Sequence, residues 1–205
     1  DVYVTMVRTG DDSTAGISTL MIEKDSPGIS FGAQEKKMGW NSQPTAQVIF
    51  EDCKVPAKNL LGNEGDGFKI AMKGLDGGRL NIAACSLGTA QSAFERAVEY
   101  VGDREQFGKK IQDFQSIQFK LADMATELEA SRLMLRSAAT KVDEGAYDKT
   151  KSAAMAKRFV TDMGFNVVNE ALQIHGGYGY LKDYPLERNL RDVRVHQILE
   201  GTNEI

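Results

Sequence analysis

The chain has 205 residues, a net charge of −4 at pH 7, 41% hydrophobic residues and 26% charged residues, an ordinary composition for a globular protein with a sizeable core. Its basic residues are scattered, which argues against a nucleic-acid partner. The two cysteines and two histidines form neither a disulfide framework nor a metal-binding pattern, and no apolar run is long enough to span a membrane.

Residues 1–62 predict short strands. The segments at residues 1–7, 16–24 and 46–55 are rich in apolar and β-branched residues, and glycine, proline and asparagine separate them. No helix between them is long enough for a parallel crossover, so we expect antiparallel pairing. The first segment has the character of a strand already under way, so we expect a fragment, in which the lack of a leader says nothing about the compartment.

After residue 62 the apolar residues follow a helical period. We expect a short helix, a tight turn at Asp76–Gly78, and then a longer helix with Asp76 or a neighbouring glycine as its cap. Two further helices are predicted over about 150–174 and 184–200, the first of them ending at "HGGYGY".

The helix expected near residues 117–142 has the clearest pattern, because its apolar residues recur at alternating steps of four and three. This stripe consists of Ile117, Leu121, Met124, Leu128, Leu135, Ala138 and Val142, with Ser131 filling the gap. The sequence therefore predicts an α+β fold. A partial antiparallel β domain, residues 1–62, precedes an antiparallel helical bundle, residues 63–205.

Glu200 follows the apolar pair Ile198 and Leu199 and precedes Gly201, at the expected end of the last helix. Apolar surroundings make a carboxylate harder to ionise, which brings it toward the range useful for a general base. Gly201 would let the backbone bend and a ligand come close. The alternative is an ordinary glutamate in water at a helix end, and the spacing alone leaves both interpretations open.

Three other segments carry groups that suit a ligand. In "HGGYGY", Gly176 and Gly177 expose backbone N–H groups suited to phosphate oxygens, or they form only a helix cap and a turn. Arg104 in "DREQFG" offers a fork of donors to a phosphate, or only a favourable charge at a helix C-terminus. The stretch Asp76–Arg79 holds a polar ligand edge, or it is a loop with a salt bridge.

The remaining rings and histidines favour structural roles. We expect His175 to be a hydrogen-bonded structural residue and His196 to be a partly exposed helix residue. Tyr178 and Tyr180 are expected to pack against the protein, and Trp40 in "GWNSQPT" is equally consistent with a buried anchor.

Several segments taken in order resemble the acyl-CoA dehydrogenase family. They are "FEDCKVP", "NEGDGF", "DGGRLNIAACSLG", "DREQFGKKIQDFQSIQFKLADMA", "ALQIHGGYGY" and "LRDVRVHQILEGTNEI". The likeness spans essentially the whole chain, and it covers the later part of the family's middle β domain and most of its C-terminal helical domain. It implies an FAD enzyme that desaturates an acyl-CoA thioester between Cα and Cβ.

The resemblance also implies roles for particular residues. Glu200 matches the catalytic base, which removes the α-proton while a hydride leaves Cβ for flavin N5. The positions that match FAD contacts are Arg104, Phe114, Gln115, Gln173, Ile174, His175, Gly176, Gly177, Thr202, Asn203 and Glu204. Those that match the acyl-CoA contact are Asp76, Gly77, Gly78 and Arg79. Residues 173–177 are expected to reach FAD across a subunit boundary of a homotetramer, and an electron-transfer flavoprotein is the expected electron acceptor.

The chain departs from the family pattern in two ways. The N-terminal helical domain and the earlier β strands are absent, so we expect that these residues alone do not complete the site. Leu199 stands where several family members have tyrosine, which leaves the pocket near the base more apolar and roomier and suits a short, branched acyl chain.

Two alternative functions and two possible compartments remain open. An acyl-CoA oxidase would use the same base, and a non-catalytic helical oligomerisation module would need no carboxylate at residue 200. The resemblance favours the mitochondrial matrix, with a bacterial cytoplasm as the alternative.

Overall fold

The computed structural model describes residues 1–204, and these fall into two compact units. The first unit contains residues 1–37 and 41–75, and the second contains residues 38–40 and 76–205. The units divide inside a helix. The predicted domain boundary between residues 62 and 63 stays a prediction.

The first unit is built on short antiparallel strands. Its elements are β1 (Val2–Arg8), η1 (Thr14–Gly16), β2 (Ile17–Glu23), β3 (Ile29–Phe31), β4 (Val48–Phe50), η2 (Ala57–Asn59) and β5 (Leu60–Leu61). One sheet has the strand order β1-β2-β5, and β3 pairs with β4 in a second sheet. Exposed and half-buried residues alternate along β1, as expected for a strand with one face toward solvent. The antiparallel pairing predicted from the sequence is confirmed.

The third predicted strand, residues 46–55, is much shorter in the structure. The strand covers Val48–Phe50, which pairs with β3. Asp52 has φ +50°, which lies outside the extended region, so the strand cannot continue through it. The apolar run of the sequence gave no sign of this backbone reversal.

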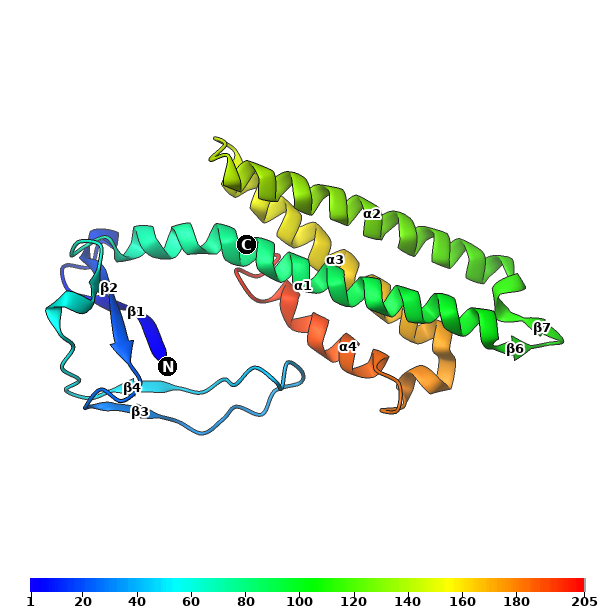
Figure 1. The fold of residues 1–205 in the computed structure, drawn as a ribbon, viewed down its shortest axis with the longest axis horizontal. Helices are drawn as coiled ribbons and strands as arrows, with labels where there is room; N and C mark the ends of the chain where they lie inside the picture. The colour runs from blue at the N-terminus through cyan, green and yellow to red at the C-terminus, as the bar shows by residue number, and fades with distance from the viewer. Residues whose placement is uncertain (205) are drawn as a thin grey trace. The chain divides into compact units, whose positions relative to one another are not determined.

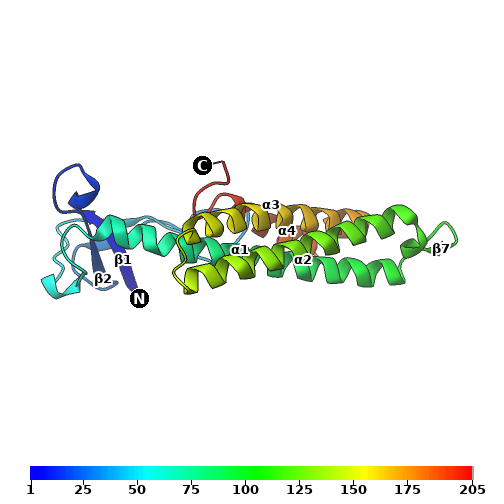
Figure 2. The ribbon, with the colours of Figure 1, turned by 90° about the horizontal axis from the view of Figure 1, so that it is seen from above.

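The second unit is a bundle of helices (Figure 1). Its helices are α1 (Gly67–Asp103), which begins in the first unit, α2 (Gln115–Asp143), α3 (Lys149–His175) and α4 (Leu186–Arg194). A small hairpin of β6 (Glu105–Gln106) and β7 (Lys109–Lys110) follows α1, and the 3-10 turns are η3 (Ile111–Asp113), η4 (Gly176–Tyr180) and η5 (Val195–Gln197). Figures 1 and 2 both show α2 and α3 side by side. The mixed fold of small antiparallel sheets and a helical bundle is the predicted α+β class.

The turn predicted at Asp76–Gly78 is wrong, because α1 is one continuous helix through these residues. A glycine inside a helix costs about 1 kcal/mol relative to alanine, so tertiary contacts must offset the pair at this point. The Asp76 carboxylate does not cap a helix. Instead it accepts a hydrogen bond of 2.8 Å from Thr150 Oγ1, at the start of α3.

The core of the bundle is formed by apolar side chains from all four helices, and on α2 it follows the predicted stripe, with Met124, Leu128 and Ala138 buried. Ser131 fills the gap as a buried residue, as predicted. The other buried members of the core are Ala83, Leu87, Ala90, Ala93, Ala97, Val101, Val160, Met163, Val167, Val168, Ala171, Ile174, Leu186 and Val193. Within residues 1–204 no helix has both the length and the apolar character needed to cross a membrane.

The last predicted helix, residues 184–200, is also shorter in the structure. Regular helix ends at Arg194 and η5 ends at Gln197, so Glu200 lies in the loop beyond. The prediction that His196 is partly exposed is wrong, because its side chain is 1% exposed and its ring lies 5.2 Å, edge-on, from that of Trp40. The backbone N–H of Trp40 donates to Asp192 Oδ1 at 2.6 Å, which holds this half-buried residue on α4.

Candidate active site

The loop that carries Glu200 has an unusual backbone. Glu200 has φ +57° and Gly201 has φ +90°, so the chain reverses through two consecutive left-handed residues. Glycine adopts this conformation readily, but for glutamate it costs of the order of 1 kcal/mol or more. Such a residue persists only where the surrounding structure holds it, and strained residues of this kind cluster at functional sites.

Helix α3 supplies the groups that hold the loop. Lys157 Nζ donates to the carbonyl of Gly201 at 2.7 Å and to Asn203 Oδ1 at 2.8 Å. The amide of Asn203 donates to Thr161 Oγ1 at 2.9 Å and to Asp162 Oδ1 at 2.7 Å. The loop is therefore fixed to one face of α3 at its sharpest turn and directly after it.

The carboxylate of Glu200 lies against the backbone of α1 at Gly78. A Cβ atom added to Gly78 would come within 2.6 Å of Glu200 Cδ and closer still to Oε2. Any residue other than glycine at position 78 would therefore push the carboxylate away. This contact gives a local reason for a glycine in the middle of a long helix.

A cavity of about 340 Å³ opens beside the carboxylate, and Thr202, Asn203 and Glu204 line it together with Glu200. The sequence predicted apolar surroundings for Glu200, but much of the cavity lining is charged. Three cationic side chains, Arg79, Lys157 and Arg158, line the same cavity. Their positive charge attracts an anionic side chain or ligand to this position. The sequence reasoning missed Lys157 and Arg158.

The predicted substrate stretch, Asp76–Arg79, lies on one helix rather than in a loop. Gly78 lies against the Glu200 carboxylate and Arg79 lines the cavity beside it, whereas Asp76 is buried and its carboxylate is held by Thr150. Arg79 Nη1 lies 3.5 Å from Asp76 Oδ1, the salt bridge that the sequence left open as an alternative. Gly77 is half-buried, and an added Cβ there would meet nothing within 4 Å.

A second cavity, of about 470 Å³, contains several of the predicted cofactor residues. Arg104, directly after the end of α1, lines it together with Ile174, His175, Gly176 and Gly177. The Arg104 guanidinium lies 5.6 Å from the centre of the Tyr178 ring. The structure therefore brings the arginine and the glycine turn, which the sequence offered as separate candidates for phosphate binding, to one cavity.

The two glycines that line this cavity, Gly176 and Gly177, differ in whether the fold requires glycine at their positions. Gly176 ends α3 with φ +57°, and its N–H donates to the carbonyl of Gln173, so part of its role is that of a helix cap. Gly177 has no positive φ, and an added Cβ there would meet nothing within 4 Å. Nothing in the described chain requires glycine at position 177. The open space beside it suits another molecule.

His175 is buried and serves the fold of this turn. Its ring stacks on that of Tyr100 with a centroid distance of 4.2 Å, and its Nδ1 donates to the carbonyl of Ala171 at 2.8 Å. Burial lowers the pKa of His175, although the hydrogen bond to Ala171 acts in the opposite direction. The structural role expected for this histidine is thus confirmed. The packing expected of Tyr180 is wrong, because its side chain is 83% exposed.

The remaining predicted cofactor residues lie apart from both cavities' linings. Phe114 precedes α2, and its ring lies edge-on to that of Phe107 at 6.3 Å and under Lys109 Nζ at 4.1 Å. Gln115 and Gln173 are exposed. The Glu200 and Arg104 cavities share no lining residue, so they are two separate sites in this chain.

Comparison with known proteins identifies the class of protein. The family model described as "Acyl-CoA dehydrogenase, C-terminal domain" matches residues 65–205, which include both cavities. The chain belongs to the acyl-CoA dehydrogenase family, whose members are oxidoreductases that use FAD.

Two relatives of the chain have more specific names. The chain is 57% identical over its full length to the mitochondrial isobutyryl-CoA dehydrogenase of Bos taurus, and 55% identical to that of Dictyostelium discoideum. It covers 49% and 50% of these proteins, so it spans about half the length of the curated relatives it matches. Among solved structures, butyryl-CoA dehydrogenase from Megasphaera elsdenii matches all of the chain with a TM-score of 0.96 and 48% identity, and the chain covers 53% of it.

The described residues fit the cofactor of the family. FAD carries a diphosphate, and the Arg104 cavity offers a guanidinium fork beside two glycines with open space next to their backbone. This donor set has the chemistry that a diphosphate requires. The sequence had drawn attention to both halves of it.

Proposed function

We propose that the complete protein containing this chain is an acyl-CoA dehydrogenase in which Glu200 is the base that removes the α-proton. The observation that carries the proposal is the position of Glu200. Its carboxylate sits on a strained turn, packs over the backbone of Gly78, and lines a cavity of its own. A structural glutamate at a helix end would need none of these features.

The reaction breaks two C–H bonds of the acyl group and forms a C=C bond between Cα and Cβ. Glu200 takes the α-proton onto a carboxylate oxygen, and the bound FAD supplies the acceptor for the hydride from Cβ. Arg79 and Lys157 line the same cavity as the base and place positive charge beside its carboxylate. The turn at Gly201 keeps the carboxylate in place, so no reorganisation is needed when the proton moves.

The Arg104 cavity is proposed to hold the diphosphate of FAD, with Gly176 and Gly177 offering backbone N–H groups. Because this cavity is separate from that of Glu200, it serves the active site of a second subunit in this proposal. That arrangement agrees with the homotetramer predicted from the sequence. The roles of Phe114, Gln115 and Gln173 in cofactor binding stay predictions.

The proposed substrate is a short, branched acyl-CoA such as isobutyryl-CoA. The names of the relatives from Bos taurus and Dictyostelium discoideum support it, and so does half-buried Leu199 directly before the base. A mitochondrial matrix location, with a bacterial cytoplasm as the alternative, and an electron-transfer flavoprotein as acceptor also stay predictions. Two assays separate the alternative functions. An acyl-CoA oxidase would consume oxygen with the substrate, and a non-catalytic oligomerisation module would be colourless.

The experiment that tests the base is Glu200→Gln in the complete protein, with Glu144→Gln at the exposed end of α2 as the matched control. The amide keeps the shape of the carboxylate but cannot take the proton. We expect the variant to bind FAD and acyl-CoA while the anaerobic bleaching of the flavin slows by several orders of magnitude. Bleaching at a near-normal rate would reject the assignment.

A further inference from the structure

Lys157 is a lysine in an unexpected place. It lies on the core face of α3, where its neighbours Ala156 and Val160 are fully buried, and its own exposed fraction is 3%. A buried ammonium group is costly unless hydrogen bonds satisfy it. The rest of the structure must therefore supply partners, and their identity indicates what the lysine does.

The hydrogen-bond partners of Lys157 are neutral oxygen atoms. Among the described residues, no carboxylate lies within ion-pair distance of Nζ. Two of its donors go to the Gly201 carbonyl at 2.7 Å and to Asn203 Oδ1 at 2.8 Å. Burial lowers the pKa of Lys157, although the charge of nearby Asp162 acts in the opposite direction. The hydrogen bonds of the ammonium group thus hold the loop that follows Glu200.

The Gly201 contact is the one next to the base. The other links between α3 and the loop lie farther from Glu200 along the chain. Asn203 and Gln197 both donate to Asp162 Oδ1 at 2.7 Å, and they reach the loop at residues 197 and 203. Among the described residues, the bond from Lys157 is the side-chain contact from α3 that reaches the backbone of Gly201, the residue directly after Glu200. Glu200 and Gly201 form one left-handed turn, so a contact that fixes Gly201 also fixes the backbone that carries the carboxylate over Gly78.

We propose that Lys157 is a positioning residue for Glu200, which fixes the Gly201 carbonyl and thereby the place of the carboxylate over α1. This inference rests on the proposed function, in which Glu200 is the base. In this role Lys157 affects the rate of α-proton removal and does not affect the binding of the acyl-CoA. A lysine that only stabilised the fold would affect the amount of active protein but not the character of the slow step.

The main variant is Lys157→Met, which keeps a long flexible side chain and removes every donor. A displacement of about 1 Å in a catalytic group lowers the rate by about 100-fold, so we expect flavin bleaching to slow by about 10- to 100-fold. The substrate concentration for half-maximal bleaching should change less than about threefold. Lys157→Arg, which keeps the charge and the donors, should recover part of the rate.

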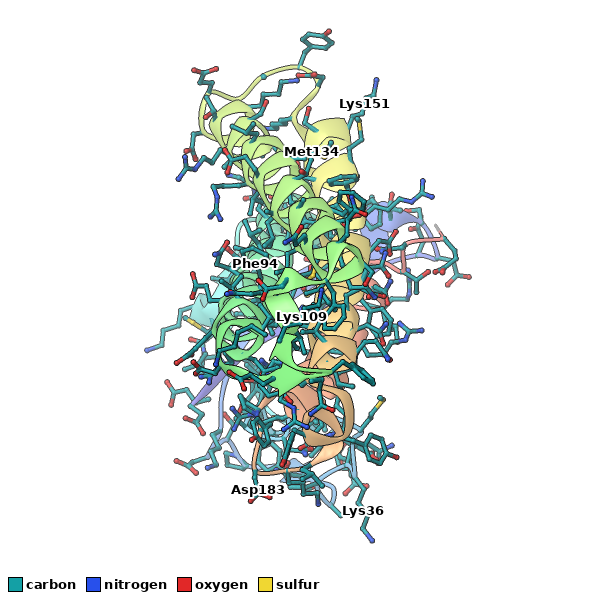
Figure 3. All side chains as sticks on the ribbon, turned by 90° about the vertical axis from the view of Figure 1, so that its right-hand side faces the viewer. Lys36, Phe94, Lys109, Met134, Lys151 and Asp183 are labelled. Carbon is teal, nitrogen blue, oxygen red and sulfur yellow. The ribbon has the colours of Figure 1, made fainter. Side chains whose placement is uncertain are left out.

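Two readouts separate positioning from stability. With α-deuterated acyl-CoA, the isotope effect on bleaching should be larger in Lys157→Met than in the wild type, because proton removal then limits the rate more strongly. Hydrogen exchange of the peptide segment 198–204 should also become faster. The matched control is Lys151→Met, an exposed lysine on the same helix that points away from the bundle (Figure 3), and it should change neither readout.

The outcomes are distinct. An unchanged isotope effect and rate in Lys157→Met, with Glu200→Gln inactive, would overturn the role of Lys157 and leave the base assignment standing. Full activity of Glu200→Gln would overturn both. If Lys157→Met does not retain FAD, the same measurements on Lys157→Gln decide the question. The shorter amide cannot serve both acceptors, so it should show the same larger isotope effect.

Discussion

Replacing Gly78 by alanine tests the geometry of the site without touching a charged group. The new Cβ would lie within 2.6 Å of Glu200 Cδ, whereas carbon atoms in contact prefer about 3.5–4.0 Å. The carboxylate must therefore move by about 1 Å. It stands at the far end of a flexible side chain, so it can move without disturbing the helices.

The effects on stability and on activity should have opposite signs. Alanine is favoured over glycine inside a helix by about 1 kcal/mol, so the variant should unfold at the same or a slightly higher urea concentration. A displacement of about 1 Å at a reacting group lowers the rate by about 100-fold. We expect the anaerobic bleaching of the flavin by acyl-CoA to slow by this factor, with FAD retained.

The control is Gly88→Ala on the exposed side of the same helix, where an added Cβ meets nothing within 4 Å. It should gain similar stability and keep its activity. Gly78→Ala with a wild-type bleaching rate would refute the placement of the carboxylate on α1. A large loss of stability would refute the argument that the clash is relieved by the side chain alone.

The other predictions concern stability and cofactor binding. Burial lowers the pKa of His196 to about 4, so its stabilising effect is complete above its unfolded pKa near 6.5 and is lost as the pH falls toward 4. The free energy of unfolding in urea should therefore drop by about 2 kcal/mol more between pH 7 and pH 5 in the wild type than in His196→Phe, and equal drops would contradict this. Thr150→Val removes the hydrogen bond to Asp76 and should lower the free energy of unfolding by about 1 kcal/mol; no change would mean that water replaces the hydroxyl. Arg104→Ala should release FAD on gel filtration while Glu200 still catalyses after excess FAD is added, and tight retention of FAD would exclude Arg104 from the diphosphate site.

The helical part of the fold could be predicted because its signal is local. The apolar stripe along α2 repeats over many turns, and a bundle-facing surface is the simple explanation of such a pattern. The break predicted at Asp76–Gly78 failed because glycine propensity is a weak local signal that tertiary contacts override. At Gly78 the override has a cause that the sequence hides, namely a carboxylate from the far end of the chain.

The candidate site was predicted in part for the same reason. Glu200 drew attention because a charge beside apolar residues and a glycine is a local anomaly, and Arg104 and the Gly176 turn were separate candidates for phosphate binding. Lys157 was missed, although a signal exists. On α3 it occupies a position where the helical period calls for an apolar residue. Its partners, Gly201 and Asn203, are distant in the sequence and meet Lys157 only in the folded chain.

The buried state of His196 had no local signal. Its neighbours Arg194 and Gln197 are polar, and an exposed helix position is the natural interpretation of such a segment. The ring becomes buried because Trp40, from a distant loop, packs on it. Burial of this kind depends on contacts between distant segments, which the pattern of a single segment does not contain.

The most direct test of Glu200 as the base follows the α-hydrogen itself. Complete protein is incubated with acyl-CoA in D2O without oxygen, and deuterium at Cα is measured by mass spectrometry. The wild type should introduce deuterium at Cα, and Glu200→Gln should do so at least about 1,000-fold more slowly while binding the thioester equally well. Equal rates of deuterium entry in the two proteins would show that another group takes the proton.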